Sequence, residues 1–165
     1  MKLSRNVFIV LLIVINIALD QITKVLTRLY VTPGSETPII GDFFTLHNVE
    51  NSGAFLGMGS DLNPTLRIIF LLVLPILVLG YVTIHIIKNK ELDRLSLIGF
   101  CCIIGGGIAN VYDRIVYGSV TDFFHIDLGG VFRTGIFNLA DMSVMLGLGL
   151  LLFAGFKNKK EIKNA

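Results

Sequence analysis

Hydrophobic residues gather in four long runs along the chain, and polar stretches separate the runs. The runs cover about residues 6–29, 64–87, 95–112 and 138–156. A helix needs roughly 20 residues to cross the apolar core of a bilayer, and each run approaches or reaches that length. The pattern predicts an all-α polytopic membrane protein with four transmembrane helices, formed as a single domain over residues 1–165.

The first run begins like a secretory signal, with basic residues before an apolar stretch. However, neither a small-x-small cleavage site nor a cysteine for lipid attachment follows, and the chain continues to Leu29 without a helix breaker. We interpret this run as an uncleaved membrane helix.

One face of this first predicted helix is polar. Asn16, Asp20, Lys24 and Arg28 recur every four residues, so they lie along the same side of a helix. We expect this side to face the interior of the bundle, where Asp20 and Lys24 neutralise each other. Two interpretations remain open: a structural ion pair that fixes helix packing, or a pair of side chains that contacts a substrate.

The polar stretch 31–63 differs from the helical runs. Pro33-Gly34 and Thr37-Pro38 mark turns, and residues 41–49 alternate in the manner of a strand. Glycines and apolar residues follow at positions 50–59. The stretch predicts a small β-like platform that lies at the membrane surface.

Two features of the later runs concern helix packing. Pro64 lies where the second run begins, and Pro75 inside the run predicts a kink, which a membrane helix tolerates when neighbours satisfy the freed carbonyl. The third run contains Gly105-Gly106-Gly107, which predicts close approach of neighbouring helices.

The basic residues predict the orientation in the membrane. Most of the 14 lysines and arginines lie at the amino terminus, in the 88–94 loop or in the carboxyl tail. These residues are Lys2, Arg5, Lys88, Lys90, Arg94, Lys157, Lys159, Lys160 and Lys163. With four crossings, all three regions fall on one side, and the positive-inside rule makes that side cytoplasmic. Both termini are then cytoplasmic, and the stretches 31–63 and 113–137 are extracytoplasmic.

Composition agrees with a membrane protein and excludes some functions. Hydrophobic residues make up 53% of the 165 and charged residues 16%, against about 25% charged in a soluble domain. A net charge of +2 is too small to indicate nucleic-acid binding. Cys101 and Cys102 are adjacent in an apolar run and predict inert buried thiols. The scattered histidines (His47, His85 and His125) lack metal-ligand spacing, so we expect neither metal nor cofactor.

Two aspartates are the strongest candidates for chemistry. Asp122 lies in the outer loop after the third run, and Asp141 lies about one turn into the fourth. Two carboxylates about 4 Å apart in a partly dry site repel by roughly 4 kcal/mol, or about three pKa units, which keeps one protonated. The ionised member can then take a proton from water while its partner polarises a peptide carbonyl.

Several neighbouring residues fit supporting roles. Asn138 is three positions before Asp141, and Asn110 is four before Arg114, so each pair shares a helical face. The guanidinium of Arg114 can hold a backbone carbonyl, a carboxylate or a phosphate oxygen. Asp113 and Arg114 also fit a structural cap and ion pair. We interpret Asp127 as an exposed acid in a turn.

Aspartates at a membrane boundary leave two other classes of function open. A proton-coupled or ion-coupled carrier could use Asp20, Asp122 and Asp141 as relays, although the chain is small and has no internal repeat. A structural membrane protein could use the same polar groups to hold its helices together.

Five short blocks narrow the choice. They are Asp20-Gln21-x-Thr23-Lys24, Asn51-x-Gly53-Ala54-Phe55, Gly106-Gly107-x-Ala109-Asn110-x-x-Asp113-Arg114, Val120-x-Asp122-Phe123 and Phe137-Asn138-x-Ala140-Asp141. Each block is weak evidence alone. Together, in this order and over nearly the whole chain, they resemble lipoprotein signal peptidase, the type II signal peptidase of bacteria.

The resemblance implies an aspartic endopeptidase whose catalytic residues are Asp122 and Asp141. Roles in supporting the two aspartates or in binding substrate carry over to seven further positions. These are Asp20, Lys24, Asn51, Gly53, Asn110, Arg114 and Asn138.

The resemblance also implies a substrate and a location. The expected substrate is a prolipoprotein carrying a diacylglyceryl group, cut immediately before its lipidated cysteine. We expect a monomer in the bacterial cytoplasmic (inner) membrane, surrounded by lipid, with its active site at the extracytoplasmic face.

Overall fold

The computed structural model describes residues 3–54 and 57–164. Of the residues used above, Lys2 and Phe55 lie outside these ranges, and the side chains of Lys160 and Lys163 are also outside the description.

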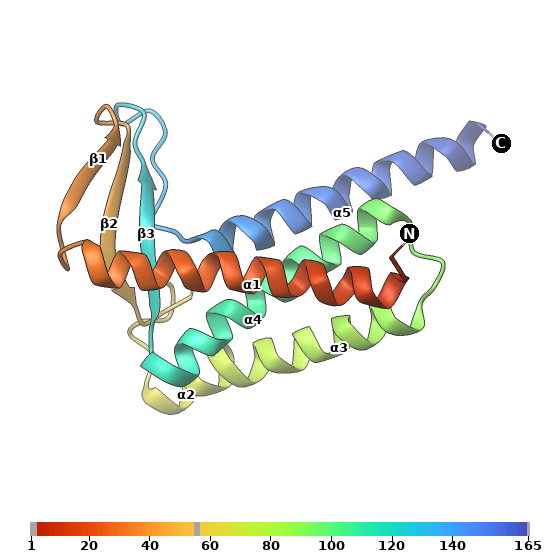
Figure 1. Cartoon of the computed structure of the whole chain (residues 1–165), viewed down its shortest axis with the longest axis horizontal. Helices are drawn as coiled ribbons and strands as arrows, with labels where there is room; N and C mark the ends of the chain where they lie inside the picture. The colour runs from red at the N-terminus through yellow and green to blue at the C-terminus, as the bar shows by residue number, and fades with distance from the viewer. Residues whose placement is uncertain (1–2, 55–56, 165) are drawn as a thin grey trace.

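Helices form a bundle that carries a small sheet at one end (Figure 1). In chain order the elements are α1 (Arg5–Tyr30), β1 (Glu36–Ile40), β2 (Phe44–Asn51), α2 (Pro64–Ile68), η2 (Ile69–Val73), α3 (Leu74–Lys88), α4 (Arg94–Tyr117), β3 (Val120–Ile126) and α5 (Leu139–Asn164). Within the described residues, four helical segments are long and apolar enough to cross a membrane: Arg5–Tyr30, Pro64–Lys88, Arg94–Tyr117 and Leu139–Lys157. The prediction of four spanning helices is therefore confirmed.

The second span is the only one of the four with an irregular turn in the described residues. Pro64 occupies its first turn, and the Asn63 side chain caps it by accepting a hydrogen bond from the Leu66 amide at 2.9 Å. Pro75 has no amide hydrogen for the carbonyl four residues earlier, and the wider π-helical turn η2 lies directly before it. The irregularity expected at Pro75 therefore takes the form of this wide turn.

The central helix is α4, and its glycine triplet explains how three helices reach it. A Cβ atom built on Gly105 would lie 2.6 Å from Cβ of Asn16 in α1, and one on Gly107 would lie 2.6 Å from Cδ2 of Leu79 in α3. On Gly106 it would press against the backbone carbonyl of Ala140 in α5. Each glycine thus admits a different neighbour, as the small-residue pattern predicted.

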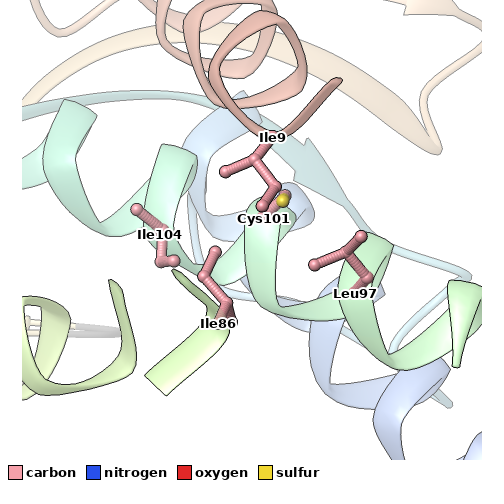
Figure 2. Close-up of a cluster of buried hydrophobic side chains, with 5 residues drawn as sticks. All are labelled: Ile9, Ile86, Leu97, Cys101 and Ile104. Carbon is pink, nitrogen blue, oxygen red and sulfur yellow. The ribbon is translucent and has the colours of Figure 1, made fainter. Parts of the chain in front are cut away.

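An apolar cluster packs α4 against α1 and α3 further along the bundle. Figure 2 shows Ile9 of α1 and Ile86 of α3 beside Leu97, Cys101 and Ile104 of α4. Both cysteines are buried and unpaired, which confirms that they are buried thiols.

The sheet contains a strand that the sequence pattern did not reveal. Its order is β1-β2-β3, with both pairs antiparallel, and Val49 of β2 lies opposite Asp122 of β3. The helix expected to end near residue 112 continues to Tyr117. Asp122, which was expected in a loop, lies on the strand β3. Most of β3 is buried on both faces, so it lacks the polar–apolar alternation by which a half-exposed strand is recognised.

Candidate functional site

Asp122 and Asp141 meet where the sheet joins the helices, although 19 positions separate them. Asn138, fully buried between them, donates a side-chain hydrogen bond to Asp122 Oδ1 at 2.6 Å. Its backbone amide donates to Asp141 Oδ2 at 3.3 Å. One asparagine therefore holds both carboxylates.

Asp122 is close to fully buried, with 3% of its surface exposed. Its second oxygen accepts a hydrogen bond from Asn51 Nδ2 at 2.9 Å. Burial raises the pKa of Asp122 to about 6, and the nearby charge of Asp141 raises it as well, whereas the hydrogen bonds from Asn51 and Asn138 lower it. Asp122 therefore holds a proton more tightly than an ordinary aspartate.

Asp141 lies in the first turn of α5 and is tied to the two helices that meet there. Asn110 Nδ2 of α4 donates to Asp141 Oδ1 at 2.8 Å. The Asp141 backbone amide donates to Asn138 Oδ1 at 2.8 Å, so Asn138 caps the helix while Asp141 accepts in return. A helix amino terminus also favours a negative charge at this position.

The orientation of each supporting amide is fixed by a neighbour that can only donate. Lys24 Nζ donates to Asn110 Oδ1 at 2.8 Å, which turns the Asn110 amino group toward Asp141. The Gly53 backbone amide does the same for Asn51, at 2.9 Å from Oδ1. Because the lysine ammonium and the backbone N–H groups of Gly53 and Asp141 can only donate, the three asparagines accept from them with their oxygens and present their own N–H groups to the carboxylates.

A cluster of buried charges lies directly behind Asn110. Lys24 Nζ is 2.8 Å from carboxylate oxygens of both Asp20 and Asp113, and all three side chains are fully buried. Asp20 also accepts a hydrogen bond from the Ala140 backbone amide at 2.8 Å, which attaches α1 to the start of α5. Asp20 and Lys24 thus form an ion pair with no exposed surface in this structure.

Arg114 and Gly53 lie at the edge of the site rather than on the carboxylates. Arg114 donates to the Gly53 carbonyl at 2.9 Å and to the Asn110 carbonyl at 3.3 Å. Its Nε is buried and has no hydrogen-bond partner among the described residues. The expected cap and ion pair of Asp113 with Arg114 is wrong, because Asp113 pairs with Lys24 and α4 ends at Gly118, whose φ is 76°.

Gly53 is required by packing. A Cβ atom on Gly53 would lie 2.5 Å from the carbonyl oxygen of Gly57 and 2.7 Å from that of Met58. A larger residue would therefore displace Gly57 and Met58.

Two cavities adjoin the site, and Ser52 lines both. The first, of about 350 Å³, opens beside Asp122 between the end of β2 and residues 135–136. The second, of about 200 Å³, lies between α2 and α4, where Arg67 donates to the Ser52 carbonyl at 2.9 Å.

A second polar cluster contacts Thr121, the residue before Asp122 in β3. The sequence alone did not indicate a role for it. Arg28 Nε donates to Thr121 Oγ1 at 2.7 Å, and its guanidinium lies 4.0 Å from the centre of the Tyr117 ring. Thr121 in turn donates to Glu50 Oε1 at 2.7 Å. The four-residue spacing placed Arg28 on the polar face of α1, but its contact with β3 needed the fold.

Asp127 lies in a turn away from this site. It accepts a hydrogen bond from the Gly130 amide at 2.8 Å and lies 3.6 Å from Arg133. In residues 3–54 and 57–164 no group of three or more histidine, cysteine or acidic side chains is arranged to hold a metal ion.

Comparison with known proteins agrees with the resemblance noted above. The model of the family described as "Signal peptidase (SPase) II" matches residues 12–157, most of the chain. The chain belongs to the signal peptidase II family. It is therefore a peptidase, and the carrier and purely structural alternatives are not supported.

The similarity to known sequences and structures extends over nearly the whole length of the chain. The lipoprotein signal peptidase of Borrelia hermsii is 35% identical to this chain, and the alignment covers 92% of each protein. That of Treponema denticola is 36% identical, and the alignment covers 91% of each protein. That of Pelodictyon phaeoclathratiforme is 38% identical over 90% of this chain and 88% of its own. A solved bacterial membrane enzyme matches with a TM-score of 0.82 at 25% identity, covering 93% of this chain and 90% of that one. This signal peptidase II is thus a multi-pass membrane protein.

Proposed function

We propose that this signal peptidase II removes the signal peptide from prolipoproteins, cutting immediately before a cysteine that carries a diacylglyceryl group. The names of the similar proteins support the substrate class. The catalytic part of this proposal rests on one observation: Asn138 holds the two carboxylates together beside an open cavity.

In this proposal Asp122 and Asp141 share one proton and activate one water molecule. The ionised carboxylate takes a proton from the water as the water oxygen attacks the scissile carbonyl carbon. The protonated carboxyl donates to the carbonyl oxygen, on which negative charge develops. Breakdown of the tetrahedral intermediate breaks the C–N bond, and the new cysteine amine takes the proton that came from the water.

The surrounding residues keep this geometry. Asn51, Asn110 and Asn138 orient the carboxylates through the hydrogen bonds described above. Arg114, whose Nε lacks an acceptor among the described residues, donates to a backbone carbonyl of the bound peptide. Asp20 and Lys24 act through Ala140 and Asn110 and do not touch the substrate.

We further propose that the site faces the extracytoplasmic side of the bacterial inner membrane, with both termini cytoplasmic. The basic residues gathered at the ends of the chain and in the 88–94 loop support this orientation. The signal helix of the precursor then enters laterally from the bilayer, and its lipidated cysteine stops at the level of the sheet.

The direct test is incubation of the purified protein with a diacylglyceryl-modified precursor, followed by mass analysis of the products. The expected products are the free signal peptide and a chain that begins with the lipidated cysteine. The same precursor without lipid, and the Asp122→Asn protein with the lipidated precursor, are the matched controls. Cleavage at another bond would contradict the proposed specificity.

The raised pKa of Asp122 predicts a pH-dependent stability. Folded Asp122 binds its proton up to about pH 6, whereas the unfolded chain releases it near 3.8. The contribution of Asp122 to stability is therefore fully present below pH 3.8 and falls as pH rises to about 6. We expect the melting temperature of Asp122→Asn, relative to that of the native protein, to increase over this range and then level off. A difference that stays constant from pH 4 to pH 8, measured by circular dichroism, would contradict this expectation.

Arg28 is expected to act as a positioning residue for Asp122. Arg28→Lys keeps the charge but loses the planar group that bonds Thr121 and stacks on Tyr117, so β3 should shift slightly. Small displacements of reacting groups cost up to about 10²-fold in rate, and we expect kcat to fall by at least about tenfold with little change in KM. Arg133→Lys, at a side chain that is 69% exposed, is the matched control. Equal kcat values for the two variants would remove this role.

A further inference from the structure

A second site lies at the end of the bundle remote from the sheet. There the start of α1 approaches the loop between α3 and α4 (Figure 1). A cavity of about 640 Å³ opens between them, far larger than the cavity beside Arg67. Nothing in the proposed peptidase mechanism uses it.

The walls of this cavity combine positive charge with apolar surface. Arg5, Lys90 and Arg94 supply the charge, and none of the described residues that line the cavity is acidic. The apolar part comes from Phe8, Leu92 and Leu97. A ligand that fits this lining has an anionic group attached to an apolar body.

In the part of the chain that the structure describes, no carboxylate in the cavity wall holds these basic side chains. Arg5 donates to the Asn89 backbone carbonyl at 2.7 Å, and the Arg94 guanidinium lies 5.9 Å from the centre of the Phe8 ring. The adjacent acid, Asp93, caps α4: its Oδ1 accepts from the amides of Leu95 and Ser96, and its Oδ2 accepts from the Ser96 hydroxyl. Arg94 is the first residue of α4, a position where the helix dipole disfavours a cation. Helix stability therefore gives no reason for an arginine here, whereas an anionic ligand does.

We propose that this cavity binds an anionic phospholipid, with the phosphate between Arg5, Lys90 and Arg94 and the first part of an acyl chain along Phe8 and Leu97. The cavity lies at the end of two membrane helices, where lipid headgroups are abundant and basic pockets attract the anionic ones. A free phosphate would leave the apolar wall unused. The ligand is thus a lipid of the leaflet opposite the peptidase site.

The test compares lipids and two neighbouring lysines. Full-length protein in detergent is titrated with phosphatidylglycerol, with phosphatidylcholine and with inorganic phosphate, and bound lipid is counted by native mass spectrometry. We expect retention of phosphatidylglycerol only. Lys90→Gln should weaken this binding about fivefold, as expected for one basic residue near an anionic lipid. Lys88→Gln removes the same charge from an exposed position two residues away, outside the cavity, and should bind like the native protein.

Arg94→Gln serves as a second variant that is not expected to impair folding. Removing a cation from the first turn of α4 does not oppose the helix dipole, so its melting temperature without lipid should not fall. Its binding of phosphatidylglycerol should fall by at least as much as that of Lys90→Gln. The proposal is overturned by equal binding of both lipids, by equal losses in Lys88→Gln and Lys90→Gln, or by phosphate alone competing fully with the lipid.

Discussion

Asp141→Asn is expected to lower the cleavage rate of a lipid-modified precursor by roughly 10³-fold, within the range that general acid–base catalysis contributes. An amide neither accepts the proton of the attacking water nor donates an acidic proton to the carbonyl. The fold should persist, because the remaining side-chain oxygen can still accept a hydrogen bond from Asn110 or from the Asn138 amide.

Asp122→Asn should cause a loss of the same order. Both oxygens of Asp122 accept N–H groups, from Asn51 and Asn138, so the new amide must turn its own N–H toward one of them. The variant therefore loses the proton carrier and one hydrogen bond. Because its folded state no longer buries an ionisable carboxyl, it should nevertheless remain inserted and folded.

The control for both substitutions is Asp127→Asn. Asp127 lies in the turn with Gly130 and Arg133, away from Asn138, and its amide variant should keep nearly full activity. Rates are measured by mass analysis of a purified lipidated precursor, with circular dichroism to check folding. Activity retained in Asp122→Asn or Asp141→Asn would remove the assignment of the two aspartates. An inactive Asp127→Asn beside an active Asp122→Asn would show that the wrong acid was chosen.

Those substitutions also separate catalysis from a purely structural role. If the aspartates served only to hold helices together, an amide would replace most of their hydrogen bonds and the effect would be mild. Loss of activity in a protein that stays folded is the pattern expected of catalytic groups, and little change in either activity or folding is the pattern expected of structural ones.

The four spans could be read from the sequence because membrane crossing imposes a simple requirement. Each run needs length and apolar side chains, and the observed bounds differ from the predicted ones mostly at the ends that meet water, as with the extension of α4 to Tyr117. The polar face of α1 was also readable, since the spacing of Asp20 and Lys24 alone places them together.

The partners of these polar groups could not be read from the sequence. Asp113 lies beside Arg114 in the chain, but successive helical residues point in different directions, and Asp113 faces Lys24 while Arg114 faces Gly53. In the same way, the contact of Arg28 with Thr121 depends on a strand whose buried pattern concealed it. The sequence identified residue types suited to the chemistry, and the fold determined which of them touch.

Lys24→Met is expected to destabilise the fold strongly. Lys24 is the shared partner of two fully buried carboxylates, Asp20 and Asp113. Removing it leaves Asp113 with Arg28, 3.6 Å away, and leaves Asp20 without an ion-pair partner among the described residues. Breaking a buried ion pair by removing one member costs about 3–5 kcal/mol. Activity should fall as well, because Asn110 loses the donor that orients its amide toward Asp141.

Unfolding of this variant can be followed without tryptophan, which the chain lacks. Cys101 and Cys102 are free and buried, so a thiol-reactive dye reports the temperature at which the bundle opens. Lys88→Met, at an exposed position, should change stability by no more than about 0.5 kcal/mol. Equal melting temperatures for Lys24→Met and Lys88→Met would contradict the expectation.

A second substitution tests whether the unpaired buried charge causes the loss of stability in Lys24→Met. Adding Asp20→Asn to Lys24→Met removes one of the two stranded carboxylates and leaves Asp113 beside Arg28. The new asparagine keeps an oxygen for the Ala140 amide, so α1 stays attached to α5. The double variant should therefore melt at a higher temperature than Lys24→Met alone, yet stay poorly active because Asn110 still lacks its donor. Recovery of stability without recovery of activity would separate the electrostatic role of Lys24 from its role in orienting the carboxylates. A double variant less stable than the single one would mean that the loss of stability comes mainly from the lost packing of the lysine side chain and not from the unpaired carboxylate.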